Sequence, residues 1–295
     1  MPVDVLGTRF RNPVVLAAGT AGFGREVADV LDLAAVGGIV TKAVSVEPRA
    51  GNPAPRVAEV PGGMLNSVGL ANPGLDVVRR EHLPWLRAHA GDTRVIINVV
   101  GHTVEQFAQV VAGLADEPVV TAFELNVSCP NVEHGGLEFG ADPGVLADLV
   151  RRARGATDRP LVVKLSPTLP DPARTAAAAV EAGADAFTCV NTLPALAFAE
   201  MPPFAARLGN GSGGLSGPPL LPVGVRMTRV VAQATGKPVI GTGGVRSGRD
   251  ARQYLQAGAS LVAVGTASFA DPRAAARIAG ELEALQHAEG VHAAR

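Results

Sequence analysis

The sequence contains only two cysteines, Cys129 and Cys189. So few thiols argue against a disulfide framework, and one chain with two cysteines cannot ligate an iron–sulfur cluster, which needs about four. No His/Cys/Asp spacing typical of a zinc site occurs in the sequence. If the protein depends on an iron–sulfur cluster, another polypeptide must carry it.

Charge and long apolar runs are also scarce. The formal net charge is −1 and no Lys/Arg run occurs, which argues against nucleic acid as a partner. No stretch approaches the ~18 uninterrupted apolar residues of a membrane span. The opening segment MPVDVLGTRF lacks the apolar run of a signal peptide. We therefore expect a cytoplasmic protein that does not contact membranes.

The sequence does contain ample apolar material, arranged as alternating strand-like and helix-like segments. Hydrophobic residues make up 47% of the 295 residues, enough for one large core, and Ala, Val and Leu must fill it because aromatic residues make up only 4%. The alternation predicts an α/β fold, a (β/α)8 TIM barrel that forms a single domain over residues 1–295. An open, doubly wound sheet is the competing architecture.

The predicted elements follow from apolar periodicity. Barrel strands are predicted at Val14–Ala17, Gly38–Lys42, Arg94–Val99, Ala122–Val127, Leu161–Leu165, Ala186–Val190, Pro238–Gly241 and Leu261–Gly265. Helices are predicted at Val104–Leu114, Pro143–Arg154, Asp171–Ala182, Gly248–Ala257 and Pro272–Leu285. A hairpin of Val3–Gly7 and Thr8–Phe10 is expected to close the N-terminal end of the barrel.

Three connections that follow predicted strands are too long to be simple links. They are Ala43–Gly74, Ser128–Asp142 and Asn191–Pro222, and all are rich in Gly, Pro and Asn. In a barrel, such loops build the active site at the C-terminal face. A GxGxxG match at Gly209–Gly214 has no preceding strand, so we interpret it as a loop and not as a dinucleotide-binding motif.

Most of the predicted strands are apolar until their last positions, where polar residues or glycines follow. The residues concerned are Lys42, Asn98, Asn126, Lys164, Asn191, Thr192, Gly243, Gly244, Gly265 and Thr266. Burial of amide and ammonium groups without partners costs several kcal/mol each, so we expect these groups to line a polar ligand site. The alternative is that each one satisfies local backbone. The glycines after the last two strands lie where barrels commonly hold a phosphate, although ordinary turn glycines would look the same.

Two of these residues are lysines, and a buried lysine needs an anion. No acidic residue appears at the matching strand ends, so we favour ligand anions over structural salt bridges. One ammonium would stabilise the negative charge that grows near N1 and O2 of a reduced flavin. The other would meet a substrate carboxylate.

Cys129 follows a predicted strand and lies between Asn126 and Asn131. The ordinary thiol pKa of ~8.5 suits a base that removes a weakly acidic carbon proton near neutral pH. The alternative, a small packed thiol, is the interpretation that we favour for Cys189 in the middle of a strand.

The segment Asn126–Asn131 resembles the active-site loop of class 1 dihydroorotate dehydrogenases, in which cysteine replaces the serine base of the membrane-linked class 2 enzymes. Arg49–Arg56 is similar to a loop signature of that family, and Asn66–Leu70 is similar to its substrate-binding NxxGL element. Gly213–Pro218 resembles the NAD-linked 1B subclass. The resemblance covers nearly the whole chain.

This resemblance implies an FMN-dependent enzyme that oxidises (S)-dihydroorotate to orotate in pyrimidine (UMP) biosynthesis, with Cys129 as the catalytic base. Electrons would pass to NAD through a partner subunit that carries FAD and a 2Fe–2S cluster, in a heterotetramer around a homodimer. The residues implied for FMN are Gly19, Thr20, Lys42, Ala43, Asn98, Asn126, Lys164, Val190, Gly217, Gly243, Gly244, Gly265 and Thr266. Those implied for the substrate are Lys42, Asn66, Val68, Gly69, Leu70, Asn126, Asn131, Asn191 and Thr192.

Three alternatives stay open. A 1A enzyme would pass electrons to fumarate and would need no partner subunit. A flavin domain like that of dihydropyrimidine dehydrogenase would reduce uracil or thymine and would need no carboxylate contact, whereas Lys42 and Asn66–Leu70 favour orotate. The third alternative is a non-catalytic flavin barrel, but such a protein would not need a cysteine between two amide side chains.

Overall fold

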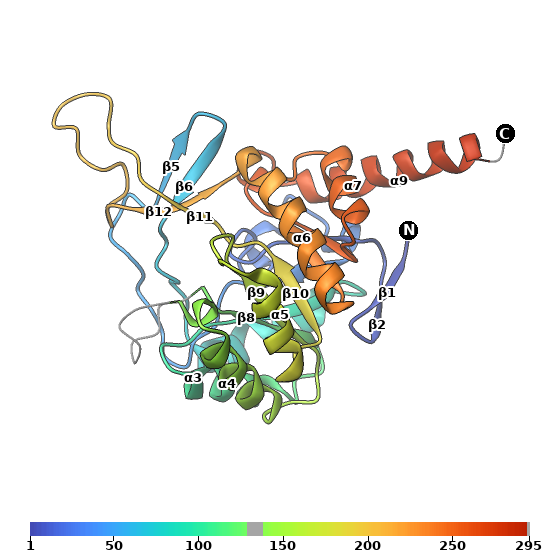
Figure 1. Cartoon of the computed structure of the whole chain (residues 1–295), viewed down its shortest axis with the longest axis horizontal. Coiled ribbons are helices and arrows are strands. Elements are labelled where there is room, and N and C mark those ends of the chain that lie inside the picture. The colour runs from blue at the N-terminus through green and yellow to red at the C-terminus, as the bar shows by residue number, and fades with distance from the viewer. Residues whose placement is uncertain (129–137, 294–295) are drawn as a thin grey trace.

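The computed structural model describes residues 1–128 and 138–293 (Figure 1). Cys129 and Asn131, the predicted base and one predicted substrate contact, lie outside the described residues. Parallel strands close into a barrel, which confirms the predicted architecture over the open sheet. In order around the barrel the strands are β10 (Ala186–Cys189), β13 (Val239–Thr242), β14 (Leu261–Val264), β3 (Val14–Leu16), β4 (Gly38–Val40), β7 (Arg94–Val99), β8 (Val120–Asn126) and β9 (Leu161–Leu165).

Helices follow the strands and cover the outside of the barrel (Figure 1). The longer ones are α2 (Leu83–His89), α3 (Val104–Leu114), α4 (Pro143–Arg154), α5 (Pro172–Glu181), α6 (Leu221–Thr235), α7 (Gly248–Gln256) and α9 (Ala274–Ala293). Short turns are α1 (Leu75–Val77), α8 (Ala267–Ala270), the π-helix η3 (Val78–His82) and the 3₁₀ turns η1 (Arg25–Val27), η2 (Leu33–Ala35), η5 (Phe139–Ala141) and η6 (Pro218–Leu220).

Capping residues explain where several helices begin. Asp171 precedes Pro172, and its carboxylate accepts a hydrogen bond from Arg174 N at 3.0 Å, as expected for an acid before a first-turn proline. Asp271 precedes Pro272 in the same way, and its Oδ1 accepts a hydrogen bond from Arg273 N at 3.0 Å. The regular helix α9 begins two residues later than predicted, at Ala274.

The N-terminal hairpin forms as predicted, from β1 (Val3–Val5) and β2 (Thr8–Phe10). Its buried side chains Val5 and Phe10 belong to one apolar cluster with residues from the barrel strands, including Ile96. The hairpin therefore packs onto the apolar end of the barrel interior.

Strand alternation places a polar layer directly after this apolar layer. Residues i and i+2 of a strand share a face, so the residue two positions after each interior apolar residue also faces the barrel interior. The pairs are Ile96 and Asn98, Ala122 and Glu124, Val162 and Lys164, Ala186 and Thr188, and Ile240 and Thr242. All five polar members are buried and lie toward the C-terminal ends of their strands.

A second sheet, which the sequence did not predict, stands on one side of the barrel (Figure 1). Its strands, in order, are β11 (Leu193–Ala195), β12 (Gly213–Ser216), β6 (Gly63–Asn66) and β5 (Val57–Val60). The first and third long connections supply these strands, so both are partly ordered by pairing with each other. Leu208, just before the GxGxxG match, bridges Gly211, and the match runs into strand β12 and not into a helix, as a dinucleotide-binding turn would. Among the described helices, none is long and apolar enough to cross a membrane.

Candidate active site

Glu124 is the centre of the polar layer inside the barrel, and the sequence analysis missed it. Its side chain is 1% exposed. Oε1 accepts a hydrogen bond from Asn98 Nδ2 and Oε2 accepts one from Thr188 Oγ1, both at 2.6 Å. The available signal was its position two residues before Asn126, which puts both side chains on the same face of β8.

Lys164 on β9 has an acidic partner, contrary to the expectation from the strand ends. Its Nζ lies 4.0 Å from Glu124 Oε1, and the two side chains are 10% and 1% exposed. Lys164 also pairs in register with Asn126 on the neighbouring strand β8. Lys42 is different: it is half-buried just beyond β4, and no described carboxylate lies within ion-pair distance of it. Of Lys42 and Lys164, Lys42 is therefore the better placed to bind a ligand anion.

Asn98 has one buried polar atom that no described residue satisfies. Its backbone is held on both sides, since Asn98 N donates to Thr41 Oγ1 at 3.3 Å and Val44 N donates to Asn98 O at 2.8 Å. The side-chain Oδ1 nevertheless has no hydrogen-bond partner within the part of the chain that the structure describes. A buried acceptor without a partner costs about 1–3 kcal/mol, so this oxygen indicates a ligand donor at the barrel mouth.

Four predicted substrate residues from three segments converge beside this layer. Asn191 Nδ2 donates to Asn126 Oδ1 at 3.3 Å, and Thr192 N donates to Asn191 Oδ1 at 2.9 Å. Asn66 on β6 donates through Nδ2 to Gly214 O at 3.2 Å. Gly214 in turn touches Thr192, because a Cβ on this glycine would lie 1.9 Å from Thr192 Oγ1. The second sheet thus connects Asn66 to the amides at the barrel strand ends.

The remaining predicted substrate contacts lie in the loop after β6. Gly69 and Leu70 both have positive φ, 72° and 56°. A Cβ on Gly69 would lie 2.6 Å from Asn52 N, and Asn52 N donates to Val68 O at 3.1 Å. These described contacts hold the Val68–Leu70 turn against the loop around Asn52. Contact of Val68, Gly69 and Leu70 with a substrate stays a prediction.

The glycine turns after β12 and β13 lie side by side. Gly243 and Gly244 have φ values of 116° and 73°, a backbone conformation that favours glycine. A Cβ on Gly244 would lie 2.9 Å from Gly217 O and 2.7 Å from Leu221 N. The structure therefore brings Gly217 and Gly244, both predicted to contact the cofactor, into one turn cluster.

Gly265, after the neighbouring strand β14, needs a different explanation. Its φ lies outside the left-handed region, and a Cβ would meet only Ala17 Cβ at 3.5 Å and Thr20 Cγ2 at 3.7 Å, which are ordinary contacts. The fold would accept alanine here, so close approach of a ligand explains the glycine better than the backbone does. Ala17 and Thr20 flank this space, and Thr20 Oγ1 donates to Ala17 O at 2.9 Å.

The two cysteines have different surroundings. Cys189 is fully buried in β10, and burial raises the pKa of its thiol far above the ordinary value, which agrees with a packed and unreactive side chain. Cys129 lies outside the described residues. The described neighbour Ser128 has a buried Oγ that no described residue satisfies, so the chain enters the cysteine loop with an unused polar group.

A surface hollow lined by Arg154 and Arg159 lies before β8 and β9, at the end of the barrel opposite the polar layer. Its guanidinium groups already bind protein atoms. Arg154 Nη1 donates to Asp185 Oδ2 at 2.9 Å, and Arg159 Nε donates to Ala115 O at 2.7 Å. The chemistry therefore belongs to the strand ends and not to this hollow.

The sequence matches the family model of dihydroorotate dehydrogenase over residues 1–285. The chain belongs to the dihydroorotate dehydrogenase family. The catalytic subunit of dihydroorotate dehydrogenase B (NAD(+)) from Geotalea daltonii is 47% identical over 283 residues, which cover 96% of this chain and 92% of that protein. The catalytic subunit of the same name from Geobacillus kaustophilus is 46% identical over 285 residues, covering 97% and 90%.

Among solved structures, a dihydroorotate dehydrogenase from Eimeria tenella in complex with ferulenol matches with a TM-score of 0.82. The match covers 98% of this chain and 85% of that chain at 23% identity, which supports the fold alone. The predicted family is thus confirmed, and the B-type names of the relatives agree with the resemblance to the NAD-linked subclass.

Proposed function

We propose that this dihydroorotate dehydrogenase family protein is the catalytic subunit of an NAD-linked enzyme that oxidises dihydroorotate to orotate. The observation that carries the proposal is the convergence of Asn66, Asn126, Asn191 and Thr192 beside the buried Lys164–Glu124 pair. Glycine turns on two adjacent strands flank the same face of the barrel. Relatives that match nearly the whole chain bear the name of the catalytic subunit of dihydroorotate dehydrogenase B.

FMN is the cofactor that fits these residues. Asn98 Oδ1 offers a buried acceptor without a described partner, and Lys164 offers a buried ammonium. The absence of a side chain at Gly265 leaves space for a ligand, and the backbone conformation at this position does not itself require glycine. The proposed FMN contacts are those that the resemblance implied, with the phosphate at Gly243, Gly244, Gly265 and Thr266. When bound, FMN supplies the hydride acceptor.

The amide side chains orient the substrate. Asn66, Asn126 and Asn191 alternate donors and acceptors, as a pyrimidine ring alternates N–H and C=O groups, and an apolar pocket would not distinguish these. Lys42 meets the substrate carboxylate, consistent with its position at the rim without a described carboxylate partner. A fixed ring orientation is what a reaction that breaks two C–H bonds requires.

Cys129 is the proposed base. It comes three positions after Asn126, the last residue of β8, in the sequence. Its thiolate would take the proton from C5 of dihydroorotate, and Asn131 would contact the substrate from the same loop. A thiol has a pKa close enough to neutrality to serve as such a base.

Electrons leave through a partner subunit in this proposal. The chain has two cysteines, too few for an iron–sulfur cluster, so FAD and the 2Fe–2S cluster belong to the partner. The segment between β11 and β12 exposes Leu196, Phe198, Met201 and Phe204, each more than half accessible. Exposed apolar side chains gathered in one segment are typical of surfaces that an assembly buries, which fits a heterotetramer around a homodimer.

The spectrum of the FMN-loaded chain tests the proposal. Orotate is expected to perturb the flavin absorption at micromolar concentration, and uracil is expected to have no effect in the same range. A response to uracil but not to orotate would favour a dihydropyrimidine dehydrogenase-like activity. Turnover with fumarate by the purified chain alone would favour the 1A type, and co-purification with an iron-containing flavoprotein supports the NAD-linked type.

A further inference from the structure

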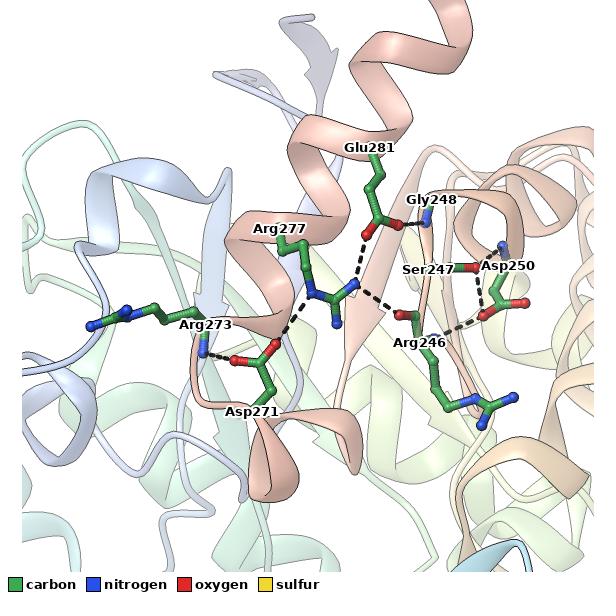
Figure 2. Close-up of polar contacts among 8 residues, drawn as sticks. All are labelled: Arg246, Ser247, Gly248, Asp250, Asp271, Arg273, Arg277 and Glu281. Atoms are coloured by element: carbon green, nitrogen blue, oxygen red, sulfur yellow. Dashed lines mark hydrogen bonds and ion pairs between the residues drawn. The ribbon is translucent and has the colours of Figure 1, made fainter.

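The C-terminal helix α9 packs across the start of α7, where Glu281 faces Gly248 (Figure 2). The helices approach so closely that a Cβ on Gly248 would lie 2.7 Å from Leu282 N. Side chains on the first turns of α9 therefore face the loops that follow β13 and β14.

Arg277 on α9 binds both of these loops at once (Figure 2). Its Nε lies 3.2 Å from Asp271 Oδ2, at the end of the segment that runs from β14 through Gly265, Thr266 and α8. Its Nη1 donates to Arg246 O at 3.3 Å, two residues after Gly244 in the β13 loop. One guanidinium therefore joins the two chain segments that follow the glycine turns.

Glu281, one turn further along α9, completes the connection. Its Oε1 accepts from Arg277 Nη1 and its Oε2 accepts from Gly248 N, both at 2.7 Å. The hydrogen bond from Gly248 is the main cause that lowers the pKa of Glu281. Ser247 and Asp250 cap the same end of α7 through their side chains. Protein groups thus already satisfy the start of α7, which leaves the phosphate to the glycine turns.

We propose that Arg277 is a positioning residue for the phosphate of the flavin, because it fixes the Gly243–Gly244 turn relative to the Gly265–Thr266 turn. The inference rests on the proposed function, in which these turns hold that phosphate. The neighbouring Arg273 extends the same connection to the β3 side, since its Nε donates to Val30 O at 2.9 Å. Arg277 is 45% exposed, so its effect comes from the geometry of the loops and not from a deep ion pair.

Affinity for two flavins separates this role from a general structural one. FMN and riboflavin share the ring and the ribityl chain, and only FMN carries the phosphate. The full-length chain is stripped of flavin, and the Kd of each flavin is measured by fluorescence quenching in wild type, Arg277→Ala and Arg277→Lys. Arg277→Ala is expected to weaken FMN binding by roughly five- to tenfold, the net scale of one ordinary hydrogen bond, and to leave riboflavin binding unchanged.

Arg152→Ala is the matched control. Arg152 makes two surface ion pairs, with Glu105 and Asp148, on α3 and α4 and away from the glycine turns. This variant is expected to bind both flavins as wild type does, and Arg277→Lys is expected to lose less FMN affinity than Arg277→Ala. If Arg277→Ala does not fold, Asp271→Asn must show the same phosphate-specific loss.

Two results would overturn the inference. In the first, wild type prefers FMN to riboflavin and the Arg277 variants keep the same preference. In the second, both flavins lose affinity equally, which marks a structural effect. If wild type binds neither flavin, the proposed function fails and the inference falls with it.

Discussion

The carboxylate of Glu124 lies 4.0 Å from the ammonium of Lys164 inside the barrel, and both side chains are buried. Hydrogen bonds from Asn98 and Thr188 hold the carboxylate in place. Loss of one partner of a buried pair leaves the other charge uncompensated. We therefore predict that Glu124→Gln lowers the free energy of unfolding of the flavin-free chain by about 3 kcal/mol.

Urea denaturation measures this loss, and a double variant identifies its origin. Lys164→Met added to Glu124→Gln is expected to recover part of the stability, because the unpaired charge is removed. Glu105→Gln, at an exposed pair with Arg152, is expected to cost less than ~1 kcal/mol. A loss in the double variant that equals the sum of the losses in Glu124→Gln and Lys164→Met alone would contradict coupling between Glu124 and Lys164.

Gly265→Ala distinguishes a glycine required by a ligand from one required by the fold. Because a Cβ there meets only ordinary contacts, the flavin-free variant is expected to unfold at the wild-type urea concentration. Its FMN affinity is expected to fall by roughly tenfold or more, since the methyl group occupies space proposed for the cofactor. Gly280→Ala, whose Cβ would have no neighbour within 4 Å, is the control. Unchanged FMN affinity in Gly265→Ala would remove this turn from the cofactor site.

Gly214→Ala is expected to weaken orotate binding and to leave FMN binding nearly unchanged. The new methyl group would collide with the Thr192 side chain, where Oγ1 lies 1.9 Å from the ideal Cβ position. Displacement of Thr192 would disturb its hydrogen bond to Asn191 Oδ1, so orotate affinity is expected to fall by roughly tenfold while FMN affinity stays within a factor of about two. Spectral titration measures both constants in one sample. Equal orotate binding in variant and wild type would separate the second sheet from substrate recognition.

The stability of the protein is expected to depend on pH through Glu138, the first described residue after Cys129. Burial raises its pKa above the ordinary value of 4.5, against a hydrogen bond with Ser166 that lowers it. Folding therefore favours the protonated form, and this stabilisation is present at low pH and is lost as pH rises through the raised pKa. Glu138→Gln stays neutral, so its stability relative to wild type is expected to be greater at about pH 7 than at about pH 4.

Urea midpoints at the two pH values measure this difference. Ser166→Ala removes the hydrogen bond that opposes the shift, and it is expected to steepen the pH dependence of the chain that retains Glu138. A stability difference between Glu138→Gln and wild type that does not change with pH would contradict the assigned direction.

The sequence predicted the barrel well because its strands are short apolar runs separated by clear helical periodicity. The bounds of β7 and β9 agree with the prediction to the residue. The second sheet escaped prediction because β5, β6, β11 and β12 are three or four residues long and lie within Gly- and Pro-rich connections. Such segments become strands only by pairing with each other across the molecule.

The candidate site was predictable where polar residues end strands and was missed where one lies inside a strand. Glu124 interrupts an apolar run, and its partners are distant in sequence, at 26 positions for Asn98 and 64 for Thr188. Only the lateral pairing of β7, β8, β9 and β10 brings these groups together. The roles of Cys129 and Asn131 rest on the resemblance to the family, since both lie outside the described residues.

The most direct test of the central claim is rapid mixing of the FMN-loaded chain with dihydroorotate, followed by flavin absorption. Wild type is expected to bleach, and Cys129→Ala is expected to bleach roughly 10²- to 10⁴-fold more slowly, the effect of a lost general base. Cys189→Ala, which alters the buried thiol in β10, is expected to bleach at the wild-type rate. A Cys129→Ala chain that bleaches as fast as wild type, or a wild-type chain that dihydroorotate does not bleach, would contradict the account.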